Sequence, residues 1–109
     1  MMERLTDQTA EEYATWFRCL ADPTRIRILR FVATAQRPVT VGEIVDAVGK
    51  RQSTVSNHLR LLADTRYVFC EPDGTRTQVR INESCMTALP EVAAMIMATN
   101  TLVQCESTP

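Results

Sequence analysis

The sequence is poor in the features on which most enzymes depend. It has a single histidine and three glycines among 109 residues. No glycine-rich phosphate loop and no serine or cysteine nucleophile motif occurs in it. No apolar run is long enough to cross a membrane. We therefore expect a protein that is not an enzyme and that has no membrane partner.

Cysteine usage excludes two further kinds of site. The four cysteines are widely separated and form no CxxC pair, which argues against a zinc knuckle and against a thioredoxin-like redox site. The first residues, MMERLTDQT, are charged and lack the apolar segment of a secretory signal. These features predict a cytoplasmic protein whose cysteines are reduced. No cofactor is expected to be required for folding.

What the chain does contain is enough for a single domain, residues 1–109. Its 45% of hydrophobic and 23% of charged residues are ordinary for a soluble protein with one core. The net charge is −1, but the charges are unevenly spread. Between residues 50 and 80 six basic side chains accompany three acidic ones, so this segment is basic although the protein is not.

Residues 40–64 have the pattern of a helix-turn-helix. Thr40 and Glu43 form a capping box at the start of the first helix, and Gly49 supplies the break after it. The second helix has an apolar stripe at i, i+4 and i+7 spacing, made of Val55, Leu59 and Leu62. Its other faces carry short hydrogen-bonding side chains, which suit the major groove of DNA.

The segments on either side extend this pattern. FRCLADPTRIRIL, residues 17–29, precedes it, with Asp22 capping a helix and Pro23 in the first turn. YVFCEPDGTRTQVRI, residues 67–81, follows it as a hairpin, with strands expected at 67–71 and 75–82 around the turn Pro72-Asp73-Gly74. In this order and spacing the three elements resemble the ArsR/SmtB family of transcriptional regulators, over roughly residues 10–103.

The resemblance implies a mostly helical α+β fold, a winged helix-turn-helix with about five helices and a two-stranded β-hairpin wing, which forms a homodimer. The helix-turn-helix would span about 40–64, the wing about 67–82, and the dimerisation helices about 10–21 and 84–103.

The helices outside the helix-turn-helix also have readable patterns. Thr9 and Glu12 predict a capping box for the first helix. The last helix is expected to start between Glu83 and Thr87 and is apolar on all faces, so a second subunit should cover it. The helix after Asp22 is expected to be central and buried by several neighbours, because apolar residues surround it: Ile26, Ile28, Leu29, Phe31 and Val32.

The resemblance also places the DNA contacts. The helix start at Lys50 and Arg51 combines free backbone N–H groups with two cations, which suits a phosphate. His58, beside the contact row, is interpreted as a helix-surface or core-edge residue. Two alternatives are a merely solvated helix face and a winged helix that binds only protein. The residues expected to bind a palindromic double-stranded operator are Val41, Lys50, Arg51, Gln52, Ser53, Ser56, Asn57, Arg60, Arg76 and Arg80.

Relatives of this kind are mostly repressors released from DNA by metal ions, metalloids or thiol-reactive species. Their thiolate motif, of the form ELCVCDL, is replaced here by VTVGEIV at residues 39–45. At the family's other site, on the last helix, Glu83 and Cys85 match the first ligand pair, but Ile96 and Thr99 occupy the second. The soft ligands that remain near the dimerisation helices are Cys85, Cys105 and Cys19.

Thiolates select soft ions. We therefore predict a transcriptional repressor released from its operator by a thiophilic ion of the arsenite, cadmium or lead class, bound through these cysteines. Oxidation or persulfide formation at the same residues is one alternative, and a regulator without an effector is another. Free cysteines are also commonly just small buried hydrophobic residues.

Overall fold

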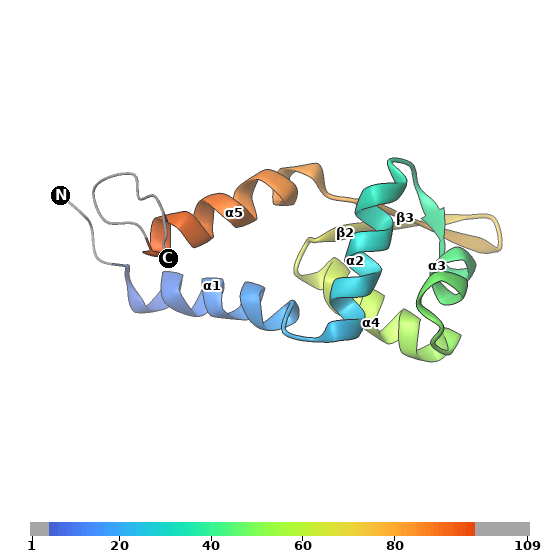
Figure 1. Ribbon diagram of the computed structural model, residues 1–109, viewed down its shortest axis with the longest axis horizontal. Coiled ribbons are helices and arrows are strands. Elements are labelled where there is room, and N and C mark those ends of the chain that lie inside the picture. The colour runs from blue at the N-terminus through green and yellow to red at the C-terminus, as the bar shows by residue number, and fades with distance from the viewer. Residues whose placement is uncertain (1–4, 98–109) are drawn as a thin grey trace, which may run out of the picture.

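A computed structural model describes residues 5–97 of the chain. Within this range it contains five α-helices and a three-stranded antiparallel sheet, which confirms the predicted winged helix-turn-helix. Figure 1 shows α2, α3, α4 and the sheet in one body, from which α1 and α5 extend to the same side. The elements are α1 (Asp7–Cys19), α2 (Pro23–Ala35), β1 (Val39–Thr40), α3 (Val41–Val48), α4 (Gln52–Asp64), β2 (Val68–Asp73), β3 (Arg76–Ile81) and α5 (Glu83–Met97).

Most helix starts follow the predicted caps. The Asp22 carboxylate accepts hydrogen bonds from the backbone N–H groups of Thr24 and Arg25, so α2 begins where expected. The capping box of Thr40 and Glu43 is present at α3. The prediction for α1 was wrong: Thr6 is the N-cap and its hydroxyl accepts from the Thr9 N–H. The helix therefore begins earlier in the chain than the pattern of Thr9 and Glu12 indicated.

The wing differs from the prediction in its turn. The turn is Gly74-Thr75, and Gly74 has a φ of 66°, as a two-residue turn with glycine at its first position allows. Pro72 and Asp73 belong to β2, where they pair with Thr77 and Arg76. Proline is tolerated there because β2 lies at an edge of the sheet, whose order is β1-β3-β2.

The strand β1 was not predicted. Val39 pairs with Val79 and Thr40 with Gln78, so the expected two-stranded wing is part of a three-stranded sheet. This pairing fixes the start of α3 beside the wing, because α3 follows β1 without a loop.

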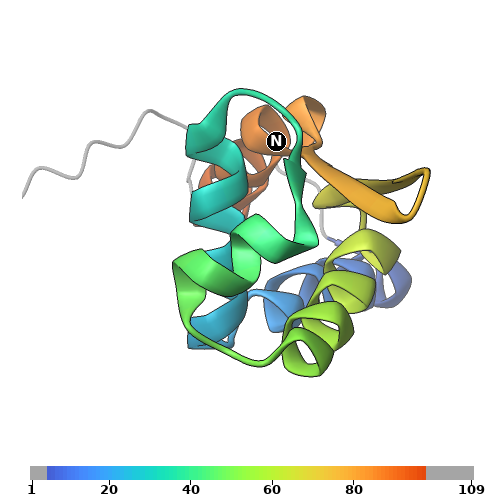
Figure 2. The same ribbon diagram turned by 90° about the vertical axis from the view of Figure 1, so that its right-hand side faces the viewer.

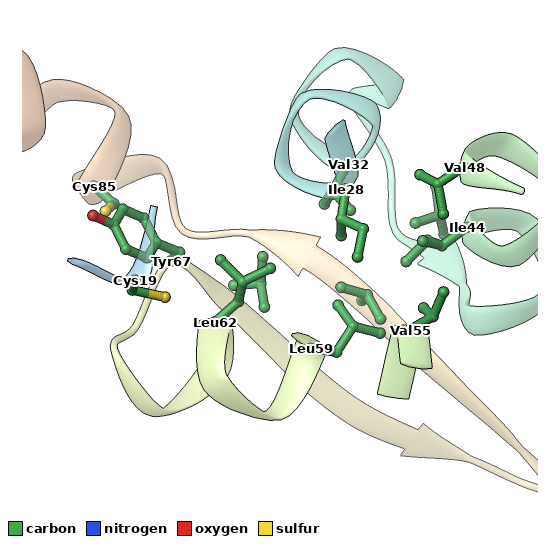
Figure 3. Close-up of a cluster of buried hydrophobic side chains, with 13 residues drawn as sticks. Cys19, Ile28, Val32, Ile44, Val48, Val55, Leu59, Leu62, Tyr67 and Cys85 are labelled. Atoms are coloured by element: carbon green, nitrogen blue, oxygen red, sulfur yellow. The ribbon is translucent and has the colours of Figure 1, made fainter. Parts of the chain in front are cut away.

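The core lies between α2, α3, α4 and the sheet (Figure 3). Val55, Leu59 and Leu62 are buried, which confirms the predicted stripe of α4. The expectation that neighbours bury α2 on all sides was wrong, because Ile26 is 52% exposed. The whole buried set is Cys19, Ile28, Val32, Val39, Ile44, Val48, Val55, Leu59, Leu62, Tyr67, Val68, Val79 and Cys85.

The last helix starts early in the predicted interval. The Asn82 side-chain oxygen accepts a hydrogen bond from the Ser84 N–H just before the first turn. Pro90 therefore lies inside α5, where it has no N–H to donate to the Met86 carbonyl. Residues 98–103, the predicted end of this helix, lie outside the described residues. None of the helices within residues 5–97 has the length and apolar character that a membrane crossing requires.

Candidate nucleic-acid interface

A row of small polar side chains follows the exposed side of α4. Buried Val55, Leu59 and Leu62 hold the helix against the core, so its remaining faces point outward. Figure 2 looks onto this end of the molecule, with α3, α4 and the wing toward the viewer. The exposed row consists of the predicted contact residues Gln52, Ser53, Ser56 and Asn57, with Arg60 one turn further along.

The first part of this row faces a hollow. A space of about 580 Å³ lies between α3, the start of α4 and the tip of the wing. Its lining includes Val41 from α3, Gln52 and Ser56 from α4, and Arg76 from β3. Four of the predicted DNA-contacting residues therefore lie around one hollow, although they come from three elements. Thr75 and Thr77 of the wing line it too, and sequence reasoning missed them because their positions depend on the hairpin register.

The start of α4 has unused hydrogen-bonding capacity. Arg51 occupies the N-cap position, and its side chain makes no capping hydrogen bond. The first backbone N–H groups of a helix have no partner within the helix, and the helix dipole favours an anion there. Lys50 and Arg51 are both exposed beside them. This end of α4 is therefore suited to a phosphate of the DNA backbone.

One predicted DNA residue is placed elsewhere. Arg80 lies 3.5 Å from the Glu71 carboxylate and 4.5 Å above the centre of the Phe69 ring. It lines a separate hollow with residues from the end of α2 and the start of α5. The structure thus brings Arg76 to the α4 row but does not bring Arg80 there.

The helix α3 that flanks the hollow is held by an ion pair that sequence reasoning missed. Both oxygens of Glu43 accept from the Arg37 guanidinium, at 3.3 and 3.0 Å, and one accepts from the Thr40 N–H at 2.8 Å. The hydrogen bond from Arg37, followed by the one from Thr40, lowers the pKa of Glu43 to about 2. Arg37 comes directly before Pro38, a position that gave no signal in the sequence.

His58 faces α2 rather than the contact row. Its Nδ1 lies 3.5 Å from Nη1 of Arg25, whose Nη2 is 3.9 Å from the Asp22 carboxylate. Hydrogen bonds from the backbone, that of Arg25 first, lower the pKa of Asp22. The location agrees with the interpretation of His58 as a core-edge residue.

The three cysteines within residues 5–97 are in two different environments. Cys19 and Cys85 are buried on either side of the Tyr67 side chain (Figure 3), and burial raises the pKa of the Cys85 thiol. Cys70 is exposed on β2. Cys105 lies outside the described residues. Within residues 5–97 no group of three or more histidine, cysteine, aspartate or glutamate side chains is arranged to hold a metal ion.

Comparison with known proteins agrees with this geometry. The sequence model of the family described as bacterial regulatory proteins, arsR family, matches residues 22–68. A protein of Streptomyces lividans named probable mercury resistance operon repressor is 36% identical over 87 residues, which cover 80% of this chain and 68% of that protein. The chain belongs to the ArsR family. It is thus a DNA-binding transcriptional regulator.

Two solved structures of transcriptional regulators have the same fold. The homodimeric winged helix-turn-helix DNA-binding domain of Mb0332 from Mycobacterium bovis is 28% identical, with a TM-score of 0.65 over 94% of this chain and 99% of that one. The AntR antimony-specific transcriptional repressor is also 28% identical, with a TM-score of 0.70 over 88% of this chain and 86% of that one.

Proposed function

We propose that this ArsR-family chain is a homodimeric repressor that reads a palindromic operator with α4. The observation that carries the proposal is the exposed row of Gln52, Ser56 and Asn57 on a helix whose opposite face is fixed in the core. Amide side chains can bridge the N6 and N7 atoms of adenine, and serine hydroxyls serve bases or phosphates. The cations at the start of α4 would hold the adjoining backbone.

The dimer is supported by apolar side chains that one subunit leaves uncovered. Met86, Met95, Ile96 and Met97 of α5 are all more than 40% exposed, and exposed apolar surface of this kind marks an interaction site. The two subunits would be related by a two-fold axis, which requires an operator with the same symmetry.

Selection of DNA from a random library tests this function. Random duplexes are enriched on the purified protein and sequenced, and we expect an inverted repeat whose half-sites are about one helical turn apart or a multiple of it. A scrambled version of the enriched duplex is the control. Enrichment of no sequence over the control would contradict specific operator binding.

The proposed effector is a thiophilic ion held by cysteine thiolates. The relatives whose names state a metal or metalloid refer to mercury resistance and to antimony, and soft thiolate ligands suit such ions as well as arsenite, cadmium and lead. Cys85 lies on α5, and Cys105 follows the same helix in the sequence. Burial raises the pKa of the Cys85 thiol, so ion binding must displace its proton and should become weaker at lower pH.

Cysteine substitutions test the effector. Cys85→Ser and Cys105→Ser should keep operator affinity but lose release by arsenite, cadmium or lead, because each removes a soft ligand. Cys19→Ser tests the third candidate ligand. Cys70→Ser is the matched control and should respond like the parent, since Cys70 lies on the wing. Gel shifts with and without each ion measure the response.

An unchanged response in a Cys85→Ser, Cys105→Ser double variant would contradict this assignment. Oxidation of the same cysteines is the alternative signal. Hydrogen peroxide in the same gel shifts separates the two signals. Release by no ion and no oxidant would indicate a regulator without an effector.

A further inference from the structure

The end of α4 meets the end of α1 at a small polar cluster. The Thr65 hydroxyl donates a hydrogen bond to the Leu61 carbonyl at 2.9 Å. The same hydroxyl also donates to the sulfur of Cys19 at 3.3 Å, and the Cys19 thiol donates to the Leu61 carbonyl at 3.8 Å. The Leu61 carbonyl therefore accepts from both α1 and its own helix end. We name Cys19, Leu61 and Thr65 the α1–α4 joint.

The backbone at this joint has a defined conformation. The N–H of Arg66 bonds to the Ala63 carbonyl and that of Tyr67 to the Leu62 carbonyl, at 3.0 and 2.9 Å, the pattern of a Schellman motif. Arg66 has a φ of 67°, where glycine is usual. The Asn82 side chain donates to the Arg66 carbonyl at 2.8 Å. The end of α4 is thus fixed by directional bonds as well as by apolar packing.

The segment after α4 is attached to α1 a second time. The Tyr67 hydroxyl donates to the Trp16 carbonyl at 2.8 Å, and the two rings are stacked with centroids 5.6 Å apart. Through Trp16, Cys19 and Leu20, the last turns of α1 reach the core. A displacement of this end of α1 therefore acts directly on the end of α4.

We propose that the α1–α4 joint transmits the position of α1 to the recognition helix, and that Thr65 is a positioning residue for operator binding. This inference rests on the proposed function, in which α4 reads DNA, and on the expectation from the family resemblance that the first helix, about residues 10–21, takes part in dimerisation. Apolar contacts hold α4 in the core, but because they are non-directional they define its axial position less sharply than hydrogen bonds do. The hydrogen bonds of the joint fix its axial position relative to α1.

The test compares Thr65→Val with Thr65→Ser. Valine has the shape of threonine without the hydroxyl, whereas serine retains the hydroxyl. Thr34→Val is the matched control. The Thr34 hydroxyl bonds to the Arg30 and Phe31 carbonyls in the same way, at 2.8 and 3.3 Å, but within residues 5–97 no hydrogen bond joins it to another helix. Affinity for the selected operator and for its scrambled duplex is measured for each dimer.

Thr65→Val should weaken operator binding about three- to tenfold, the range that the loss of a typical hydrogen bond produces. Thr65→Ser and Thr34→Val should stay within about twofold of the parent, and affinity for the scrambled duplex should not change. Cys19→Ala, which leaves the helix end intact, should show part of the loss. A variant that combines Cys19→Ala with Thr65→Val should lose little more than Thr65→Val alone, because both changes break one joint.

The possible outcomes distinguish a failure of the α1–α4 joint from a failure of the proposed function. A parent protein that binds its operator, with Thr65→Val equal to Thr34→Val, would overturn the joint and leave the proposed function in place. Strictly additive losses in the double variant would overturn it as well. If the parent enriches no operator at all, the proposed function fails and the joint fails with it.

Discussion

Ser56→Ala, Asn57→Ala and Gln52→Ala are each expected to weaken operator binding by about 1 to 3 kcal/mol, the cost of losing one good base contact. All three side chains are exposed on α4, so their removal leaves the core unchanged. Dimerisation and the thermal unfolding midpoint should therefore equal those of the parent. Fluorescence anisotropy with the selected operator and with its scrambled duplex measures the loss of specific binding.

Arg51→Ala is expected to affect DNA binding differently from the three polar substitutions, because Arg51 is proposed to contact a phosphate and not a base. Arg51 precedes the first turn of α4 and makes no capping bond, and a phosphate contact carries no sequence information. Its loss should weaken binding to operator and scrambled duplex alike and reduce the slope of log affinity against log salt by about one unit. Unchanged operator affinity in all three polar variants would contradict the assignment of α4 to the major groove.

The α4 row could be predicted from the sequence because it follows from local rules. Helical periodicity places Val55, Leu59 and Leu62 on one side, and the polar residues on the opposite side of the helix then face solvent. The start of α3 was equally local, since the capping box of Thr40 and Glu43 lies within four residues. In both cases the signal and the structure that it determines lie within one helix.

The wing could not be predicted to the residue, because its register depends on where the chain turns. The two-residue turn at Gly74-Thr75 pairs Asp73 with Arg76 and Phe69 with Arg80. Alternation then places Arg80 beside Phe69, while Thr77 faces the hollow. Choosing Pro72-Asp73-Gly74 as the turn shifts these pairs. The strand β1 was missed for a related reason, since two residues become a strand only through pairing with distant Val79 and Gln78.

The joint between α1 and α4 was also beyond sequence reasoning. Cys19 was considered only as a metal ligand, an oxidation-sensitive thiol or a buried thiol, whereas its sulfur contacts Thr65, which is 46 positions away. The α1 start was misplaced because two threonines three residues apart, Thr6 and Thr9, both fit a cap.

Ile96→Glu is expected to abolish the dimer and with it most operator binding. Ile96 on α5 is 45% exposed in one subunit, and in the proposed interface a glutamate would be buried without a partner, which is strongly unfavourable. A monomer loses the gain from binding two linked half-sites, which is roughly 10²- to 10⁴-fold. Sedimentation velocity measures the association state, and anisotropy with the selected operator measures the affinity.

Ile26→Glu is the matched control. It makes the same substitution at an apolar residue of α2 that is 52% exposed. The Ile26 side chain lines a shallow hollow with Phe31 and Ala47, and no residue of α1 or α5 lines that hollow. It should remain dimeric and bind the operator like the parent. Because both changes add one negative charge, a general electrostatic effect on DNA binding would lower both affinities equally. Loss of the dimer in Ile26→Glu but not in Ile96→Glu would move the subunit interface from α5 to α2 and remove the proposed spacing of the two recognition helices.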